Sequence, residues 1–180
     1  SDPSYHPILS AFYDECCQHI RALIKAGKDV IVLCEGDPFF YGSFMHIYDR
    51  LRTDCPTEVV PAITGMSGAW AATGQPATLG DDILSVLMGT LPESELAARL
   101  ADTDAAVVMK IGQNLNKIRR ALVTAGRADE AYIVEYATMP RQSVCRLKDY
   151  GAERAPYFSI ITLHGKGRNL LRLAANIDVE

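Results

Sequence analysis

Apolar side chains recur at helical spacing near the start of the chain. Within residues 8–26 they fall three or four positions apart, which is the pattern of a helix that buries one face. Gly27 follows directly, and glycine is common just beyond a helix C-terminus because it adopts a left-handed backbone without a steric penalty. The pattern therefore predicts an amphipathic helix that ends at Gly27.

Short continuous apolar runs alternate with further helical patterns. The run "DVIVLC", residues 29–34, is rich in β-branched side chains and predicts a strand covered on both faces, as in a parallel sheet. Similar runs predict strands at 57–64, 83–87, 105–110, 131–136, 143–147 and 157–165. Helical spacing predicts helices at 43–51, 65–74, 92–102 and 114–126.

The order of these elements defines the expected fold class. Strands alternate with helices in the first half and cluster toward the end, so the chain is expected to be an α/β protein. We expect two layered αβα units, an N-terminal unit at 1–80 and a C-terminal unit at 81–180, joined near residues 78–83. The first unit offers only two clear strands, which is few for a doubly wound sheet.

Charge and cysteine content narrow the class of protein. The 180-residue chain has a net charge of −4 and no long basic run, so nucleic acid is not expected as a partner. No apolar stretch approaches the ~20 residues that span a bilayer, and the first residues lack the features of a signal peptide. The five cysteines are odd in number and form no C-x-x-C pair, so neither a disulfide framework nor a zinc site is expected. A cytoplasmic protein with reduced thiols fits best.

The loop "CEGDPFFYGS", residues 34–43, follows the first predicted strand. Ligands of open α/β sheets bind beyond the carboxyl ends of strands, which makes this loop a candidate site. Gly36 would let a ligand approach the backbone, Pro38 would stiffen the loop, and Asp37 could accept hydrogen bonds. The loop lacks the glycine motifs that bind phosphate, and its acid would repel phosphate, so a neutral or cationic ligand suits it better. A plain turn is the alternative.

Two later loops follow predicted strands in the same way. The stretch "VPAITGMSGAWAATG", residues 60–74, is rich in Gly and Ala, which either let a flat ligand lie against the backbone or allow close helix–sheet packing. The stretch "VVMKIGQN", residues 107–114, places Met109 and Lys110 at a strand end. Neither H-E-x-x-H nor G-x-S-x-G occurs, and no catalytic residue is assigned.

Taken in order, these segments resemble the tetrapyrrole methylases, the S-adenosylmethionine-dependent enzymes of cobalamin and sirohaem synthesis. The resemblance covers nearly the whole chain and rests on "CEGDPFFYGSF", "VPAITGMSGAWAATGQP", "VVMKIGQN", "EYATMPRQ" and "APYFSI". The longer match "GDPFFYGSFMHIYDRL" resembles the branch that methylates carbon 20 of precorrin-2 to give precorrin-3A. Cobalt-factor II of the anaerobic route is the alternative substrate. A non-catalytic α/β module that binds a small molecule is the alternative from another class.

The resemblance also implies an architecture and a set of site residues. Members of the family have two αβα domains with S-adenosylmethionine between them and are commonly homodimers. By resemblance, the cofactor would be bound, mostly through backbone groups, by Glu35, Gly36, Asp37, Phe40, Thr64, Gly65, Met109, Ala137, Met139, Phe158 and Ser159. The tetrapyrrole, a polycarboxylate, would contact Tyr41 and Arg141, and the basic cluster Lys117–Arg120 is a further candidate for its carboxylates.

The start of the chain departs from the family pattern. The family begins with a strand and a "G-x-G-P-G-D"-type loop that helps to bind the tetrapyrrole, and no such motif precedes "SDPSYHPILS". The first αβα unit is therefore expected to be incomplete at its N-terminus, with residues 29–34 beside a gap or a sheet edge. We expect the cofactor part of the site to be more complete than the tetrapyrrole part.

Overall fold

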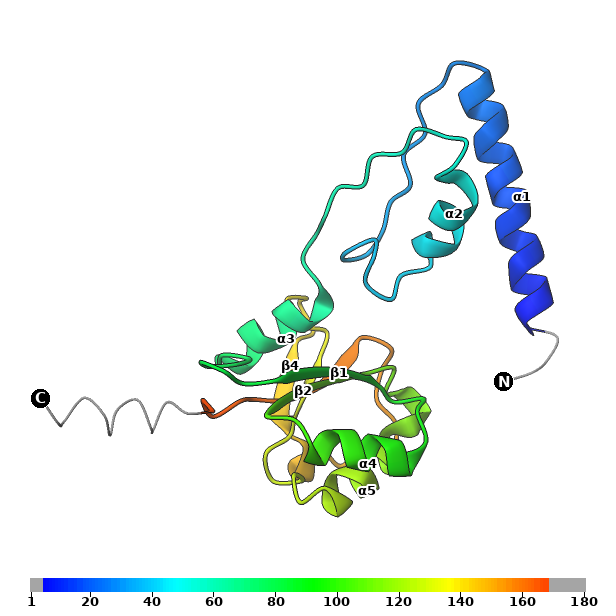
Figure 1. Cartoon of the computed structure of the whole chain (residues 1–180). Coiled ribbons are helices and arrows are strands. Elements are labelled where there is room, and N and C mark those ends of the chain that lie inside the picture. The colour runs from blue at the N-terminus through cyan, green and yellow to red at the C-terminus, as the bar shows by residue number, and fades with distance from the viewer. Residues whose placement is uncertain (1–4, 169–180) are drawn as a thin grey trace, which may run out of the picture. The chain divides into compact units, whose positions relative to one another are not determined.

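The computed structural model describes residues 5–168, which Figure 1 colours along the chain. The chain divides into two compact units, Ser1–Thr64 (unit 1) and Gly65–Glu180 (unit 2). This division comes before the boundary at residues 80 and 81 that the sequence suggested, because helix α3 (Gly65–Thr73) packs against strands of unit 2. The division into an N-terminal domain at 1–80 and a C-terminal domain at 81–180 stays a prediction.

Unit 1 is built on two helices, α1 (Tyr5–Lys25) and α2 (Phe44–Leu51), as the apolar spacing predicted. Gly27 follows the end of α1 with a φ of 73°, and its N–H donates to the Ile24 carbonyl oxygen at 2.9 Å. The predicted helix end is thus confirmed. The two helices enclose a small core of Cys17, Leu51 and Cys55.

The two strands predicted in unit 1 do not form. Residues 29–34 and 57–64 run as irregular chain without a ladder of hydrogen bonds, so both strand predictions are wrong. A strand is stable only beside other strands, and the described residues supply no neighbour for either segment. Both segments line an apolar groove of about 850 Å³ within unit 1. Their largest exposed side chains are Ile31 (83%), Leu33 (91%), Val60 (72%) and Ile63 (78%).

Unit 2 contains a five-stranded sheet in the order β1-β2-β5-β3-β4. Its strands are β1 (Leu84–Met88), β2 (Ala105–Met109), β3 (Tyr132–Glu135), β4 (Ser143–Arg146) and β5 (Ser159–Leu163). β1 and β2 are parallel, whereas β5 runs antiparallel to both β2 and β3, and β4 runs antiparallel to β3. Every strand falls within an apolar run of the sequence, and the α/β fold class is confirmed.

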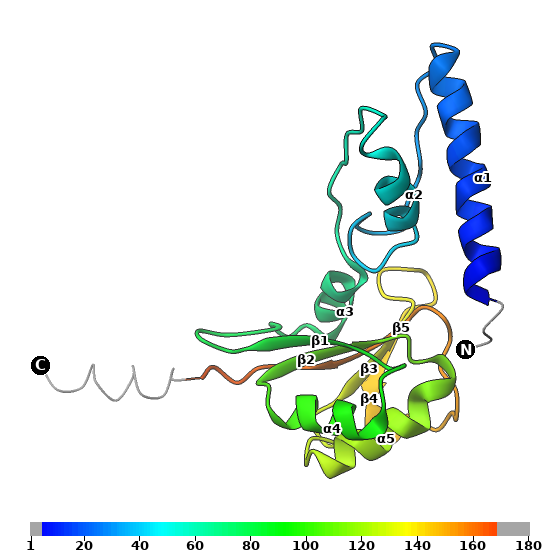
Figure 2. The same ribbon diagram turned by 45° about the vertical axis from the view of Figure 1, so that its right-hand side comes forward.

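Helices cover both faces of this sheet. Helices α4 (Glu93–Ala101) and α5 (Leu115–Thr124) lie on one face, and α3 lies on the other (Figure 2). Two single-turn helices, Gly112–Asn114 and Leu147–Asp149, lie in the connections. The main core fills the space between α4, α5 and the sheet, and its fully buried side chains include Leu96, Leu100, Ile118, Leu122, Ile133, Ile161 and Leu163.

Two expectations from composition concern membranes and thiols. Within residues 5–168, no helix is long and apolar enough to cross a membrane. All five cysteines are free thiols, as expected. Burial raises the pKa of the Cys17 and Cys145 thiols, which keeps both protonated and unreactive at neutral pH.

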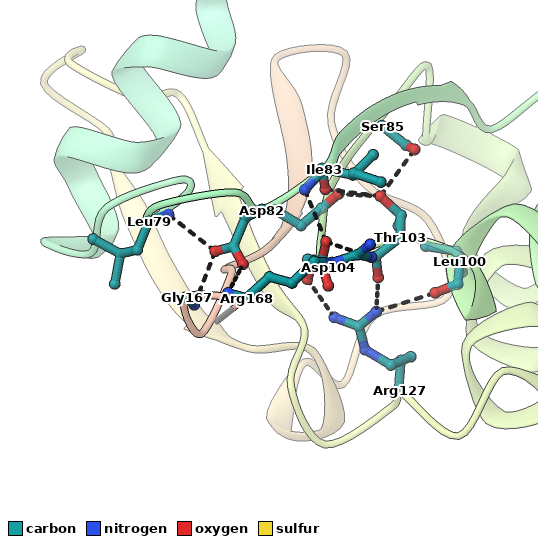
Figure 3. A network of polar contacts seen from close by, with 11 residues as sticks. Leu79, Asp82, Ile83, Ser85, Leu100, Thr103, Asp104, Arg127, Gly167 and Arg168 are labelled. Atoms are coloured by element: carbon teal, nitrogen blue, oxygen red, sulfur yellow. Dashed lines mark hydrogen bonds and ion pairs between the residues drawn. The ribbon is translucent and has the colours of Figure 1, made fainter. Parts of the chain in front are cut away.

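The Asp82 carboxylate connects the segment before β1 to the segment after β5. Asp82 accepts hydrogen bonds from the backbone N–H groups of Leu79, Gly167 and Arg168 at 2.9, 3.0 and 2.5 Å (Figure 3). These N–H groups, that of Arg168 foremost, lower the pKa of Asp82. The segment before β1 is thereby held against the segment after β5.

Replacing Asp82 by Asn is expected to remove part of the acid sensitivity of unit 2. Because the folded-state pKa of Asp82 lies below its ordinary value of ~3.9, the carboxylate stabilises the fold above that pH. This stabilisation is lost as the pH falls through the folded-state pKa. We expect the Asn variant to have a lower urea midpoint than the parent protein at neutral pH. Between neutral pH and about pH 3, the midpoint of the variant should fall less than that of the parent. The fluorescence of Trp70, the single tryptophan, would report the unfolding.

Asp102→Asn is the matched control for this prediction. Asp102 is exposed at the end of α4, and no described residue forms a hydrogen bond with its side chain. The control should lose stability in acid as the parent protein does. An Asp82→Asn variant with the same acid loss as the parent would contradict the role assigned to this carboxylate.

Candidate functional site

The carboxyl ends of three strands meet at one edge of the sheet in unit 2. β5 is antiparallel to both β2 and β3, so β1, β2 and β3 all run the same way. Their ends therefore lie beside the start of β5. We call this region the carboxyl edge, and it comprises Gly89, Met109, Lys110, residues 136–142, Phe158 and Ser159.

The loop at 136–142 is held by its own hydrogen bonds. The Tyr136 N–H donates to the Phe158 carbonyl oxygen at 2.8 Å, and the Thr138 N–H donates to Gln142 Oε1 at 2.7 Å. Tyr136 and Thr138 have φ angles of 49° and 64°, a left-handed conformation that is uncommon outside glycine. Such a backbone is more frequent at ligand sites than elsewhere. The loop is thus a defined structure that projects from the end of β3.

Two glycines bring α3 close to this edge. A Cβ on Gly65 would lie 3.5 Å from Ile160 Cδ1. A Cβ on Gly68 would lie 3.4 Å from both the Ala137 Cβ and the Thr138 Cγ2. The small residues of "GMSGAWAATG" therefore allow close packing of the helix on the sheet and the loop, which was one of the two interpretations of this stretch.

The Ser159 hydroxyl at the carboxyl edge is buried. The Oγ of Ser159 is inaccessible, and no described residue forms a hydrogen bond with it, although the side chain is only 5% exposed. Leaving a buried polar group unpaired costs roughly 1–3 kcal/mol. The observation fits a polar ligand at the start of β5 that would complete this hydrogen bond.

In unit 1 the loop at 34–43 has a special backbone. Gly36 has a φ of 77°, and a Cβ at this position would lie 3.5 Å from the Ile63 carbonyl oxygen. Tyr41 also has a positive φ, 53°, and its ring meets the Phe40 ring edge-on with centroids 5.0 Å apart. Glu35 is exposed. The loop thus presents backbone, two aromatic rings and a carboxylate.

Asp37 has a structural role, which agrees in part with the turn alternative for this loop. Its Oδ2 accepts a hydrogen bond from the Ala62 N–H at 3.0 Å, and its Oδ1 accepts one from the Phe39 N–H at 2.9 Å. These two N–H groups, that of Ala62 foremost, lower the pKa of Asp37. The carboxylate therefore joins its own loop to the segment at 57–64. It remains negatively charged at neutral pH.

Comparison with known proteins decides the family. A family model described as "Tetrapyrrole (Corrin/Porphyrin) Methylases" matches residues 1–149. A precorrin-2 C(20)-methyltransferase of Sinorhizobium sp is 49% identical over 164 residues, which are 91% of this chain and 67% of that protein. The chain belongs to the tetrapyrrole methylase family. The resemblance found in the sequence motifs is confirmed.

Two further matches extend the comparison. A cobalt-precorrin-2 C(20)-methyltransferase of Salmonella typhimurium is 29% identical over 158 residues, covering 86% of this chain and 66% of that protein. The chain thus spans about two thirds of the length of both curated relatives. The uroporphyrin-III C-methyltransferase of Thermus thermophilus, solved with S-adenosylhomocysteine, has a TM-score of 0.61. It is 24% identical and covers 89% of this chain and 74% of that one, a likeness of fold.

Within this tetrapyrrole methylase, five of the expected cofactor residues lie together at the carboxyl edge. They come from three places in unit 2, the end of β2, the loop after β3 and the start of β5, and are Met109, Ala137, Met139, Phe158 and Ser159. Gly65 begins α3, directly after Thr64, the last residue of unit 1. Glu35, Gly36, Asp37 and Phe40 share the loop of unit 1. A cofactor role for either group stays a prediction.

The two expected contacts of the substrate differ in their setting. The Arg141 guanidinium lies over the Tyr136 ring, 4.3 Å from its centroid, at the carboxyl edge. Tyr41 lies in the loop of unit 1 with its side chain 47% exposed. Their role in binding the tetrapyrrole stays a prediction.

The basic cluster Lys117–Arg120 is part of a helix that packs on the sheet. It belongs to α5, on the opposite face of the sheet from α3. Arg120 pairs with Glu93 at 2.7 Å, and Arg119 donates to the carbonyl oxygens of Tyr150 and Ala152. These interactions tie α5 to its neighbours, so the structure favours a structural role for this cluster.

Two residues of the edge were not singled out as site residues in the sequence. Lys110 has a φ of 54°, and Gly89 packs against it, because a Cβ on Gly89 would lie 2.8 Å from the Lys110 carbonyl oxygen. Gly89 also directly follows β1, where its N–H donates to the Met109 carbonyl oxygen at 2.7 Å. A glycine after an apolar run was the available signal for this close approach. Nothing in the sequence marks a lysine for a left-handed backbone.

Proposed function

We propose that the protein transfers the methyl group of S-adenosylmethionine to carbon 20 of precorrin-2, giving precorrin-3A, in the synthesis of the corrin ring. The observation that carries this proposal is the 49% identity, over 91% of the chain, to a precorrin-2 C(20)-methyltransferase. Identity to the enzyme named for the cobalt-containing substrate is 29%. The difference favours the metal-free substrate over cobalt-factor II.

The residues of both units suit S-adenosylmethionine as the methyl donor. This molecule carries a sulfonium and an ammonium, and the loop of unit 1 offers the carboxylates of Glu35 and Asp37. Gly36 leaves the backbone open to a ligand at this loop. At the carboxyl edge, the unpaired Ser159 hydroxyl and the half-exposed Phe158 and Met139 side chains suit a nucleoside, which has hydroxyls and a flat ring.

The chemistry assigned to these residues is positioning. When bound, S-adenosylmethionine would supply an electrophilic methyl group and leave as S-adenosylhomocysteine, and the conjugated ring of the substrate would supply the nucleophilic carbon, which loses its proton afterwards. Holding two reactants in line can lower the barrier by ~7–11 kcal/mol, so no strong general base is needed for the attack. The backbone groups of the loops and the aromatic side chains Phe40 and Phe158 would hold the reactants and exclude water.

Oligomeric state and compartment are parts of the same proposal. The exposed apolar side chains at 29–34 and 57–64 support a homodimer, because apolar surfaces of this kind tend to be covered by a partner. The free cysteines support a reducing compartment, the cytoplasm.

The proposal is tested by methyl transfer with the intact protein. Labelled S-adenosylmethionine would be offered with precorrin-2 and, separately, with cobalt-factor II, and the rate of label entering the tetrapyrrole would be measured. We expect transfer to precorrin-2 at the higher kcat/KM. A preference for cobalt-factor II would establish the alternative substrate. Binding of S-adenosylhomocysteine without transfer to either tetrapyrrole would establish the non-catalytic binding module.

A further inference from the structure

The Phe39 side chain packs the loop at 34–43 against α2. Its ring meets the Tyr48 ring edge-on, with the two centroids 4.8 Å apart, and its centroid lies 6.2 Å from that of the Phe44 ring. Tyr48 and Phe44 both belong to α2, whereas Phe39 belongs to the loop. Edge-to-face ring pairs stabilise a contact beyond the area that they bury. The contact therefore attaches the loop to the helix.

Helix α2 is a firm support for this ring, because polar side chains bind it to α1. Arg50 of α2 donates to Asp14 Oδ1 at 2.6 Å and to Ser10 Oγ at 2.9 Å, and both acceptors lie on α1. In return, Arg21 of α1 donates to the Arg50 carbonyl oxygen at 2.6 Å and to Asp54 Oδ2 at 2.7 Å. A ring that packs on α2 is thus attached to the body of unit 1.

The backbone of Phe39 continues this connection. Its N–H donates to Asp37 Oδ1 at 2.9 Å, and Asp37 Oδ2 accepts a hydrogen bond from the Ala62 N–H at 3.0 Å. Ala62 lies in the segment at 57–64, which ends at Thr64. A continuous series of contacts therefore runs from α2 through Phe39 and Asp37 to this segment. It links the two parts of unit 1 that carry expected cofactor residues.

The exposure of the Phe39 ring argues against a role in the core. The side chain is 47% exposed, and it is not part of the small core that α1 and α2 enclose. Loss of a half-exposed ring leaves that core intact, so its main consequence would be a loop that is free to move. A loop that is already held in its bound conformation loses less conformational freedom when a ligand binds, which raises the affinity.

We propose that Phe39 is a positioning residue, which holds the loop at 34–43 in the conformation that binds S-adenosylmethionine. The inference rests on the proposed function, because it takes this loop to be part of the cofactor site. Phe39 acts through its contact with Tyr48, and the contacts with the cofactor itself are left to its neighbours in the loop, such as Gly36 and Phe40.

The test is a double-mutant cycle on Phe39 and Tyr48, measured as the affinity for S-adenosylhomocysteine. Calorimetry of the intact protein would give the Kd for the parent, Phe39→Ala, Tyr48→Ala and the double variant. Each single substitution is expected to raise the Kd about tenfold, which corresponds to the loss of one strong ring pair. Because both substitutions remove the same contact, the double variant should also lose about tenfold, whereas independent effects would multiply. Phe39→Tyr, which keeps the ring, should lose less.

Phe12→Ala is the matched control for the cycle. The Phe12 side chain is 56% exposed on α1, and its ring meets the Tyr13 ring edge-on with centroids 5.4 Å apart. The substitution therefore removes a ring of similar exposure that does not support the loop, and the Kd should stay at the parent value. Circular dichroism should show the helix content of the parent in every variant, which separates a displaced loop from an unfolded unit 1.

The possible outcomes separate this inference from the proposed function. Parent-like affinity in Phe39→Ala would overturn the role of Phe39 and leave the methyltransferase proposal standing. A double variant that multiplies the two single losses would also overturn it, since Phe39 would then act independently of Tyr48. Lost helix content in Phe39→Ala, or an equal loss of affinity in Phe39→Tyr, would contradict an anchoring ring as well.

The parent protein supplies the remaining distinction. A parent that binds S-adenosylhomocysteine and shows the expected cycle, but transfers no methyl group, would refute the proposed function and leave the role of Phe39 standing. A parent that does not bind S-adenosylhomocysteine would refute both.

Discussion

Replacing Gly36 by Val is expected to weaken binding of S-adenosylhomocysteine on the order of a hundredfold or more. Two effects of the substitution act together. The φ of 77° is accessible to glycine but strained by ~1–2 kcal/mol for other residues, and more for a β-branched one. A Cβ would also lie 3.5 Å from the Ile63 carbonyl oxygen, so the remaining Val methyl groups would enter the space assigned to the ligand. Calorimetry of the intact protein would measure the affinity.

Gly27→Val provides the matched control. Gly27 has nearly the same φ, 73°, but it lies beyond the end of α1, where a Cβ would have no atom within 4 Å. Its substitution should cause similar backbone strain and leave the affinity for S-adenosylhomocysteine unchanged. Parent-like affinity in Gly36→Val would remove this loop from the cofactor site, and equal losses in both variants would show that strain alone is responsible.

Replacing Arg127 by Met is expected to lower the free energy of unfolding of unit 2 by about 3 kcal/mol. The Arg127 guanidinium donates to the carbonyl oxygens of Leu100, Thr103 and Asp104 at 3.1, 2.7 and 2.9 Å (Figure 3). It also pairs with Glu130. Its side chain is only 15% exposed. Met would fill much of the volume but would leave three carbonyl oxygens without their donor, and the Glu130 carboxylate would keep only its contact with Lys166. Urea unfolding followed by Trp70 fluorescence would measure the change.

Arg120→Met is the control for this second result. Arg120 forms one ion pair, with Glu93, in which the two side chains are 61% and 40% exposed. Exposed pairs contribute between ~0 and ~1 kcal/mol, so this variant should unfold almost as the parent does. A change below ~1 kcal/mol in Arg127→Met would contradict the view that this network holds α4 and α5 in place.

The helices and the sheet of unit 2 were predictable because their signals are local. The spacing of Leu96 and Leu100, or of Ile118 and Leu122, is set by the helical repeat and can be recognised without knowledge of the partner. The apolar run within 105–110, which includes Val107 and Val108, is long enough to indicate a buried strand. The order β1-β2-β5-β3-β4 was not predictable, because nothing local in the 157–165 run specifies a place between β2 and β3.

The failures in unit 1 also have a physical cause. Residues 29–34 have the composition of a strand, but a strand depends on hydrogen bonds to a neighbour, and the described residues provide none there. A sequence motif also cannot show which groups a carboxylate contacts in the fold. Asp37 directly follows Gly36, yet its two carboxylate oxygens accept hydrogen bonds from the backbone N–H groups of Phe39 and Ala62.

The expected cofactor residues of unit 2 came from family resemblance, and the sheet topology explains why they lie together. Met109, Ala137 and Phe158 are far apart in the sequence but belong to chain segments that end or begin at one edge. Their side chains carry little distinctive chemistry, so composition alone could not identify them. Lys110 was not among the residues expected from the resemblance, because its left-handed backbone and its exposure become visible only in the structure.

The most direct test of the central claim is the position of the transferred methyl group. The intact protein would be incubated with precorrin-2 and S-adenosylmethionine carrying a carbon-13 methyl group, and the product would be examined by NMR spectroscopy. We expect one new labelled methyl group, attached to carbon 20 of the ring. Label at any other carbon, or no transfer by a protein that binds both ligands, would contradict the account.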